Sequence, residues 1–117
     1  MLFRKVEIEG HRYRIRSLPK RTRIKADGDV DSDRRILRVN NELPNKDWWV
    51  AFFHETDHAV LFENGYTANE GIVDTISSGT VRTLTENTNI ACGLILFLME
   101  NQKVKAVIKE ALCDNSQ

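Results

Sequence analysis

The amino-acid sequence predicts an α+β fold in which short β-strands come first and helices follow. Residues 5–40 contain two stretches in which apolar and polar side chains alternate, as they do in half-buried strands. From about residue 47 this alternation gives way to long segments rich in apolar residues, which is typical of helices. Strands grouped before helices favour an α+β fold over one in which the two alternate along the chain.

The first strand pair is predicted within residues 5–18. Val6 and Ile8 occupy one face of the first strand, and Tyr13 and Ile15 occupy one face of the second. Lysine, glutamate and arginine residues fill the positions between them. We therefore expect an antiparallel hairpin with one apolar face and one charged face.

A second antiparallel hairpin is predicted between residues 22–31 and residues 34–40, with its turn near Ser32 and Asp33. Apolar residues again take alternate positions in its second strand and would share one face. Two hairpins in succession complete the β-part of the predicted fold.

The central helix is predicted to cover residues 47–64, with Asn45 as its cap and Gly65 as its stop signal. Apolar residues lie almost all round this helix, so we expect it to be buried at the centre of the domain. A second helix is expected over residues 68–84, and one or two more over residues 88–111.

The length of 117 residues suits one hydrophobic core, so residues 1–117 are expected to form a single domain. The longest apolar run, residues 90–99, is too short to span a bilayer and predicts a buried helix. Two cysteines cannot form a disulfide framework, and no secretory signal opens the chain. We expect a cytoplasmic protein without a membrane partner.

Charge is distributed unevenly, although the formal net charge is zero. Residues 1–25 contain nine basic and two acidic residues, and the rest of the chain is correspondingly acidic. Such an asymmetry can mark a contact with nucleic acid. No nucleic-acid-binding motif accompanies it, so a solvated basic strand pair is the better interpretation, and a nucleic-acid-binding domain is kept as an alternative.

The central helix carries two histidines and a glutamate among apolar residues, in the segment HETDH. His54 and His58 are four residues apart, which places both imidazoles on one face of the helix, where they can bind one metal ion. The spacing HExxH is a zinc signature in which the glutamate, here Glu55, acts as general base rather than ligand. Burying three polar side chains without a purpose would be costly, which favours a metal site over core histidines.

A catalytic zinc site needs a third protein ligand and one open position. Glu70 follows His58 by twelve residues, in the segment NEGIVD, and a turn between them would bring the next helix back past the first. Glu70 could then face the two histidines. Asp74, one turn further on, is placed to accept the outer ring N–H of a ligand histidine. We therefore predict a zinc site formed by His54, His58 and Glu70.

The motifs HETDH and NEGIVD together resemble those of the gluzincins, zinc peptidases whose third ligand is a glutamate on the next helix. The size and order of elements look closer to the minimal zincins encoded by phages and prophages, akin to the ImmA/IrrE-type metallopeptidases. The resemblance covers roughly residues 1–85, and its specific part is residues 54–74. It implies a zincin-like domain with the ligands named above, Glu55 as base and Asp74 orienting a ligand histidine.

The function implied by this resemblance is zinc-dependent hydrolysis of a peptide bond in a flexible segment of another protein, with the water activated by zinc and Glu55. The resemblance also suggests a regulator, such as a repressor, as substrate. The strand at residues 34–40 is expected to lie at the sheet edge and to pair with the substrate backbone. A second alternative is a binding or regulatory module that keeps the zincin fold with weak or no activity.

Two departures from the family pattern matter. Asp57 is charged at a position where such enzymes usually carry an uncharged residue, and we expect it to pair with an arginine of the hairpins. No second histidine follows the site to stabilise the transition state, and Tyr66 is a candidate for that role. The metal itself stays open, because two histidines and a carboxylate also accept iron, cobalt or manganese.

Overall fold

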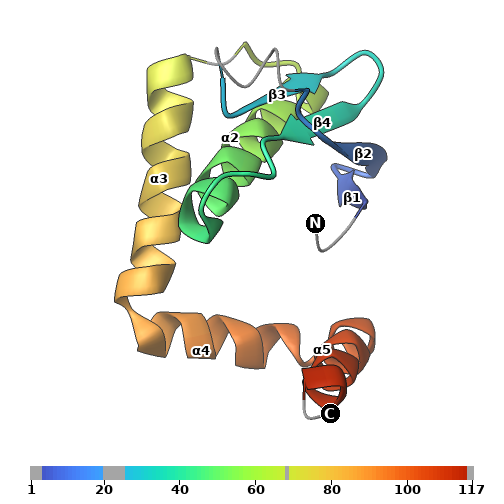
Figure 1. The fold of residues 1–117 in the computed structure, drawn as a ribbon, viewed down its shortest axis with the longest axis vertical. Helices are drawn as coiled ribbons and strands as arrows, with labels where there is room; N and C mark the ends of the chain where they lie inside the picture. The colour runs from blue at the N-terminus through green and yellow to red at the C-terminus, as the bar shows by residue number, and fades with distance from the viewer. Residues whose placement is uncertain (1–3, 20–25, 68, 116–117) are drawn as a thin grey trace. The chain divides into compact units, whose positions relative to one another are not determined.

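The computed structural model describes residues 4–19, 26–67 and 69–115, with side chains described as far as residue 110. Figure 1 shows the chain, which is α+β as predicted. The strands are β1 (Lys5–Ile8), β2 (His11–Ser17), β3 (Gly28–Asp31) and β4 (Ile36–Val39). The helices are α2 (Asn45–Glu63), α3 (Glu70–Glu86), α4 (Thr88–Leu98) and α5 (Gln102–Asn115). The chain forms two compact units, Met1–Val81 and Arg82–Gln117, which are described separately.

The four strands form one mixed sheet in the order β1-β2-β4-β3. Both predicted hairpins are present and antiparallel, although residues 22–25 of the second lie outside the described residues. The first turn has positive φ angles at Glu9 and Gly10, 50° and 78°, a geometry that matches the twist of the strands it joins. The two hairpins meet through parallel pairing of β2 with β4, in which Ile15 lies opposite Leu37.

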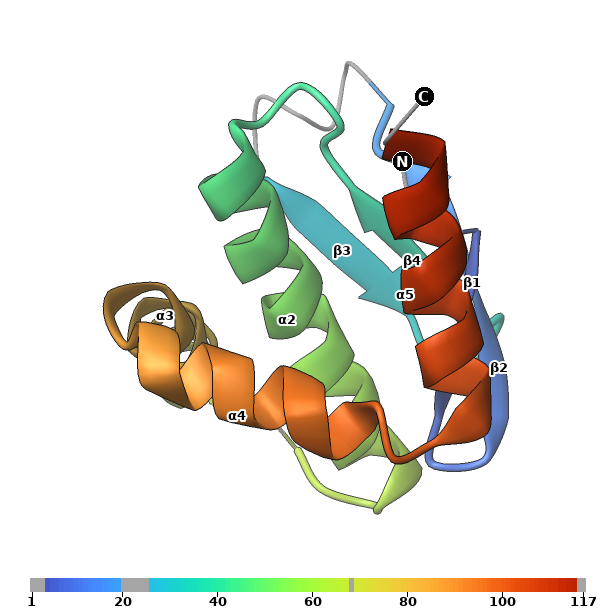
Figure 2. The ribbon, with the colours of Figure 1, turned by 90° about the horizontal axis from the view of Figure 1, so that it is seen from below.

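This strand order changes which strand is available to a ligand. We expected residues 34–40 to lie at the sheet edge, but β4 pairs with β2 on one side and β3 on the other. That prediction is wrong, because the alternation of residues reports which face is buried and not which neighbour a strand finds. The edge strands are β1 and β3, and Figure 2 shows β3 beside α2.

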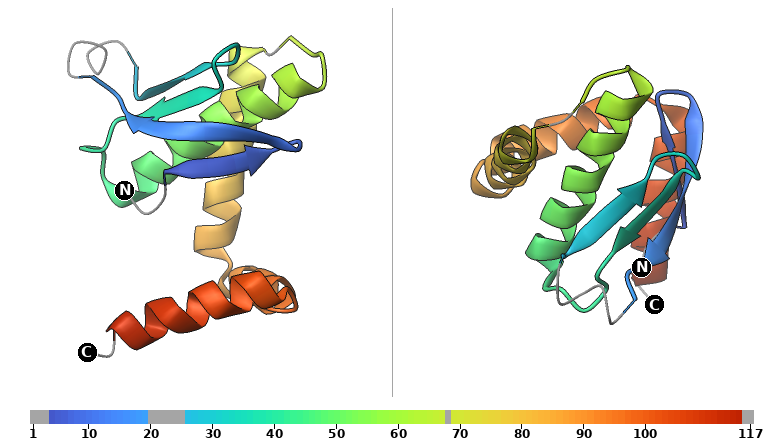
Figure 3. Two further views of the ribbon diagram at one scale, coloured as in Figure 1. Left: turned by 90° about the vertical axis from the view of Figure 1, so that its right-hand side faces the viewer. Right: turned by 90° about the horizontal axis from the view of Figure 1, so that it is seen from above.

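The core of the first unit lies between the sheet and α2, which crosses one sheet face as Figure 3 shows. From the sheet, the side chains that share this face and are fully buried are Tyr13, Ile15, Leu37 and Val39. From α2, the buried apolar side chains are Ala51, Phe52 and Ala59. The two alanines carry only a methyl group and so let the helix backbone approach the sheet closely.

The ends of α2 show which capping signals the chain uses. Asn45 is not the cap as predicted, because the helix already begins there and Pro44 is the N-cap, with extended angles of φ −53° and ψ 151°. The helix ends where expected. Gly65 has a φ of 80°, and the amides of Gly65 and Tyr66 donate to carbonyls of the preceding turn. This is the Schellman pattern, which glycine favours because it lacks a Cβ.

α2 is less buried than its apolar sequence predicted. Only four of its side chains are buried, and Phe62 is 44% exposed. The reason is that the first unit has two layers, so the sheet covers only one side of the helix. Aromatic side chains cover part of the remaining helix surface by packing on one another. Trp48, for example, stacks on Phe52 with 5.3 Å between ring centroids.

The predicted C-terminal helices are present, with α3 starting two residues later than residue 68, which is itself outside the described residues. The segment 88–111 forms two helices, α4 and α5. The apolar run at residues 90–99 was predicted to be buried, but no side chain of α4 is buried, so that prediction is wrong. No helix in the described part of the chain is long and apolar enough to cross a membrane.

A polar network joins the sheet to the last residue of α2. The Tyr13 hydroxyl donates to Glu63 Oε1 at 2.6 Å, and the Arg35 guanidinium donates to both oxygens of Glu63 at 2.9 and 3.3 Å. His11 Nε2 lies 3.4 Å from the same carboxylate. Hydrogen bonds from Arg35 and then Tyr13 lower the pKa of Glu63 to about 2, and burial raises the pKa of Tyr13 to about 12.

We expect the Glu63→Gln variant to be less stable than the wild type at neutral pH, with the difference shrinking in acid. A carboxylate whose pKa is lowered on folding stabilises the folded state fully above its ordinary pKa of 4.5, and that contribution fades as the pH falls toward about 2. Guanidinium unfolding followed by circular dichroism between pH 7 and pH 2 measures it. The control is Glu7→Gln, whose ion pair with Arg12 is exposed and should matter little. An equal pH dependence in Glu63→Gln and wild type would contradict the assignment.

Candidate metal centre

The two histidines of α2 point to the same side of the helix and approach each other. His54 Nε2 and His58 Nε2 are 3.1 Å apart, and the ring centroids are 4.8 Å apart. Both side chains are largely buried, with 18% and 15% of their surface exposed. Two partly buried imidazole nitrogens facing one point are what the four-residue spacing predicted.

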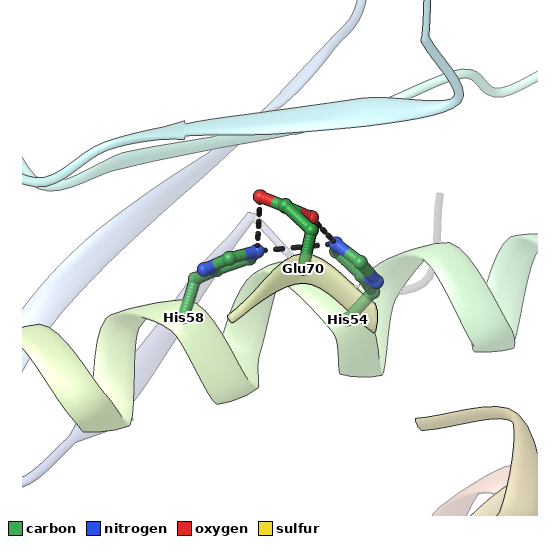
Figure 4. Close-up of side chains that lie close together, drawn as sticks. All are labelled: His54, His58 and Glu70. Carbon is green, nitrogen blue, oxygen red and sulfur yellow. Dashed lines mark hydrogen bonds and ion pairs between the residues drawn. The ribbon is translucent and has the colours of Figure 1, made fainter. Parts of the chain in front are cut away.

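Glu70 reaches the histidines from the first residue of α3. Its Oε2 lies 3.0 Å from His54 Nε2 and its Oε1 lies 2.9 Å from His58 Nε2, as Figure 4 shows. Asn69 sets the start of this helix, because its side-chain oxygen accepts the amide of Ile72 at 3.1 Å. Partial burial raises the pKa of Glu70, but hydrogen bonds with His58 and His54 outweigh it, so the pKa lies below its usual value.

These three residues fit a metal ion. One donor atom from each lies within 4.8 Å of the others. Two ligands bound tetrahedrally at about 2.1 Å from zinc would be roughly 3.4 Å apart, close to the distances of 2.9 to 3.1 Å seen here. Two imidazoles and a carboxylate are also the donor set of many catalytic zinc sites. Exposed acidic groups are common without a metal, so the fit rests on the histidines and their shared direction.

Asp74 lies behind His54, on the side away from Glu70. Its Oδ1 is 3.6 Å from His54 Nδ1, which is within ion-pair range but longer than a hydrogen bond. The carboxylate therefore faces the outer ring nitrogen, as expected for a residue that orients a ligand histidine.

Glu55 is the most enclosed acidic residue of the site. It is 8% exposed, and its carboxylate has no hydrogen-bond or ion-pair partner among the described residues. Burial, with the nearby charges of Asp29 and Glu70, raises its pKa to about 7. A carboxylate without a fixed partner and with a near-neutral pKa can accept and release a proton at neutral pH.

Gly28 on β3 makes room for this glutamate. A Cβ added at Gly28 would stand 3.2 Å from Glu55 Cγ and 2.8 Å from the main-chain oxygen of Arg38. The carbonyl of the neighbouring strand therefore leaves no room for a Cβ at this position, and the Glu55 side chain packs closely against the same glycine. Sequence reasoning missed this contribution, and a glycine inside a strand pattern was the signal that could have revealed it.

A cleft of about 590 Å³ contains the site. Its floor is α2 from Asp47 through His54 to His58, and its roof is residues 26–30, including most of β3. Glu70 and Asp74 of α3 complete its lining. The candidate ligands, the candidate base and the edge strand β3 therefore share one open space.

Among the described residues of the hairpins, no arginine pairs with Asp57, so the prediction is wrong for these residues. Its Oδ2 lies 3.0 Å from the hydroxyl of Ser77, which is fully buried on α3. Asp57 is not among the residues that line the cleft, and its carboxylate instead contacts the helix that carries Glu70. The contact joins α3 to α2 two turns beyond Glu70 and so helps to hold the glutamate against the histidines.

Tyr66 lies in the turn between α2 and α3 and is 68% exposed. It is not among the residues that line the cleft. The structure thus brings together five of the six predicted site residues and leaves Tyr66 outside.

Comparisons with protein-family models, curated proteins and solved structures found no match to this chain.

Proposed function

We propose that this chain is a zinc-dependent peptidase with a minimal zincin-like domain, acting on a flexible segment of another protein in the cytoplasm. The observation that supports it best is the convergence of His54, His58 and Glu70 in an open cleft. A buried glutamate without a partner stands directly beside them. A metal-storage or structural site would have no need of that free base, because structural zinc sites are closed by protein ligands.

The chemistry follows from the roles of the residues. A bound zinc ion supplies a Lewis acid that polarises the scissile carbonyl and lowers the pKa of a water molecule. Glu55 accepts a proton from the attacking water and donates it to the leaving amine as the C–N bond breaks. Asp74 holds the ring of His54 in orientation through its outer nitrogen.

The substrate backbone is expected to add to the free edge of β3. This strand is paired on one side only among the described strands, and it forms the roof of the cleft above the candidate ligands. An extended peptide placed there would gain main-chain hydrogen bonds and pass over the histidines. A regulator such as a repressor, which the family resemblance suggests, would have to offer an unfolded segment.

A second candidate function is a zinc-containing binding module with little or no activity. The position of Tyr66 favours it, because this tyrosine lies outside the cleft. None of the described cleft residues is a tyrosine, lysine or arginine that could stabilise a developing oxyanion.

Two measurements test the proposed function. Elemental mass spectrometry of the purified, untagged protein should find about one zinc per chain, and the His54→Ala variant should have lost it. Hydrolysis of fluorescein-labelled casein should stop when a chelator removes the metal and return when zinc is restored. No bound metal after zinc is added would refute the metal centre. Zinc without hydrolysis would favour the binding module.

A further inference from the structure

The cleft is strongly acidic. Apart from the two histidines, every titratable side chain described along it is a carboxylate. These carboxylates are Asp27, Asp29, Asp47, Glu55, Glu70 and Asp74. No lysine or arginine among the described residues lines the cleft.

Four of these carboxylates are accounted for by their contacts or by the proposed chemistry. Glu70 faces both histidines, and Asp74 faces His54. Asp29 is held by the guanidinium of Arg38 on the neighbouring strand. Glu55 is the candidate base.

The remaining two, Asp27 and Asp47, are exposed and have no side-chain partner among the described residues. Asp47 lies in the first turn of α2, and Asp27 lies in the roof, one residue before β3. Asp47 precedes His54 by seven residues, which is two helical turns or about 10 Å along the same face. Two negative charges without a partner among the described residues therefore line the cleft, Asp47 in its floor and Asp27 in its roof.

The same cleft has the features of a binding site independently of these charges. Glu55 is more than nine-tenths buried, is without a partner among the described residues, and faces into it. Gly28 leaves the roof strand close enough to the helix to enclose that carboxylate. The metal centre and the two exposed aspartates therefore line one and the same cleft.

We propose that the cleft selects peptides that carry an arginine or lysine two or three residues from the bond at the metal centre, with this side chain received by Asp27 and Asp47. The spacing follows from the roughly 10 Å between Asp47 and His54, because an extended chain rises about 3.3 Å per residue. A guanidinium between two carboxylates makes charge-assisted hydrogen bonds that a neutral side chain of equal size cannot match. The identification of the ligand as a peptide rests on the proposed function.

The test uses peptide hydroxamates, whose hydroxamate group binds zinc and so fixes the register of the peptide. Probes extend in either direction from the hydroxamate, and each has arginine or its neutral isostere citrulline at the second or third residue. Their affinities for the zinc-loaded wild-type protein are measured by fluorescence anisotropy at low salt. We expect one arginine probe to bind about two- to fivefold more tightly than its citrulline partner, as for an exposed ion pair, and the difference to shrink as salt screens the charges.

The double variant Asp27→Asn, Asp47→Asn should remove this preference and leave binding of the citrulline probe unchanged. The matched control is Asp33→Asn, which makes the same kind of charge change in an exposed turn outside the cleft. Equal binding of arginine and citrulline probes, a preference that survives the double variant, or no binding of any probe would each overturn the inference. A clear arginine preference in a preparation that hydrolyses no peptide would support it and contradict the peptidase function instead.

Discussion

Replacing Glu55 by glutamine is expected to abolish peptide hydrolysis while zinc stays bound. Glutamine has nearly the same shape as glutamate, but it cannot accept the proton of the attacking water. Loss of a general base reduces rates by about 10²- to 10⁴-fold. The His54, His58 and Glu70 side chains are untouched, so the zinc content should remain near one per chain. Casein hydrolysis and elemental analysis of the same preparation measure the two effects separately.

A matched control for this substitution is Glu86→Gln, which makes the same change at an exposed position near the end of α3. It should keep both zinc and activity. If Glu55→Gln hydrolysed casein at the wild-type rate, Glu55 could not be the base. If it lost its zinc, the glutamate would have to be assigned a structural part in the metal centre instead.

Replacing Gly28 by alanine is expected to destabilise the protein and to disable the site. The added Cβ would stand 2.8 Å from the main-chain oxygen of Arg38, and a backbone atom cannot move aside without disturbing the pairing of β3 with β4. Overpacking of this kind costs typically about 1–3 kcal/mol. Because the same Cβ would also press on Glu55, activity should fall at least about tenfold in protein that remains folded and keeps its zinc. Guanidinium unfolding, zinc content and casein hydrolysis report the three effects.

Gly93→Ala is the natural comparison, because nothing lies within 4 Å of the Cβ that it would add. Alanine in a helix interior is favoured over glycine by up to about 1 kcal/mol, so this variant should be as stable as the wild type or more so. Wild-type stability and activity in Gly28→Ala would mean that an added Cβ meets neither the carbonyl of Arg38 nor Glu55 closely enough to matter.

The elements of the fold could be predicted wherever the signal was local. Alternation located both hairpins, and Gly65 marked the end of α2, because side-chain period and left-handed backbone geometry act over a few residues. The parallel pairing of β2 with β4 could not be predicted in this way. It joins segments about twenty residues apart, and Ile15 and Leu37 fit a buried strand pair in either direction.

The same difference between local and long-range signals separates the parts of the site that could be predicted from those that could not. His54, His58 and Glu70 were predicted from spacing, since each helix fixes its own side-chain directions and one short turn joins the two helices. The roof of the cleft was not predicted, because β3 comes from a hairpin whose place in the sheet depends on distant contacts. The partner of Asp57 was missed for a related reason. Ser77 lies twenty residues away, and a serine in a helical stretch carries no sign that it will be buried.

The short turn between α2 and α3 has a thermodynamic consequence. His54 and Glu70 are sixteen residues apart, so a metal ion that binds both closes only a small loop of chain. The conformational entropy lost in closing a loop grows with the logarithm of its length, and each doubling of the loop costs only about 0.6 kcal/mol more. Both ends of this turn are already ordered, by the Schellman bonds after Glu63 and by the Asn69 cap. Most of the chain ordering that metal binding requires is therefore completed when the two helices form. Because little conformational entropy is then lost on binding, more of the coordination energy contributes to the affinity for the metal.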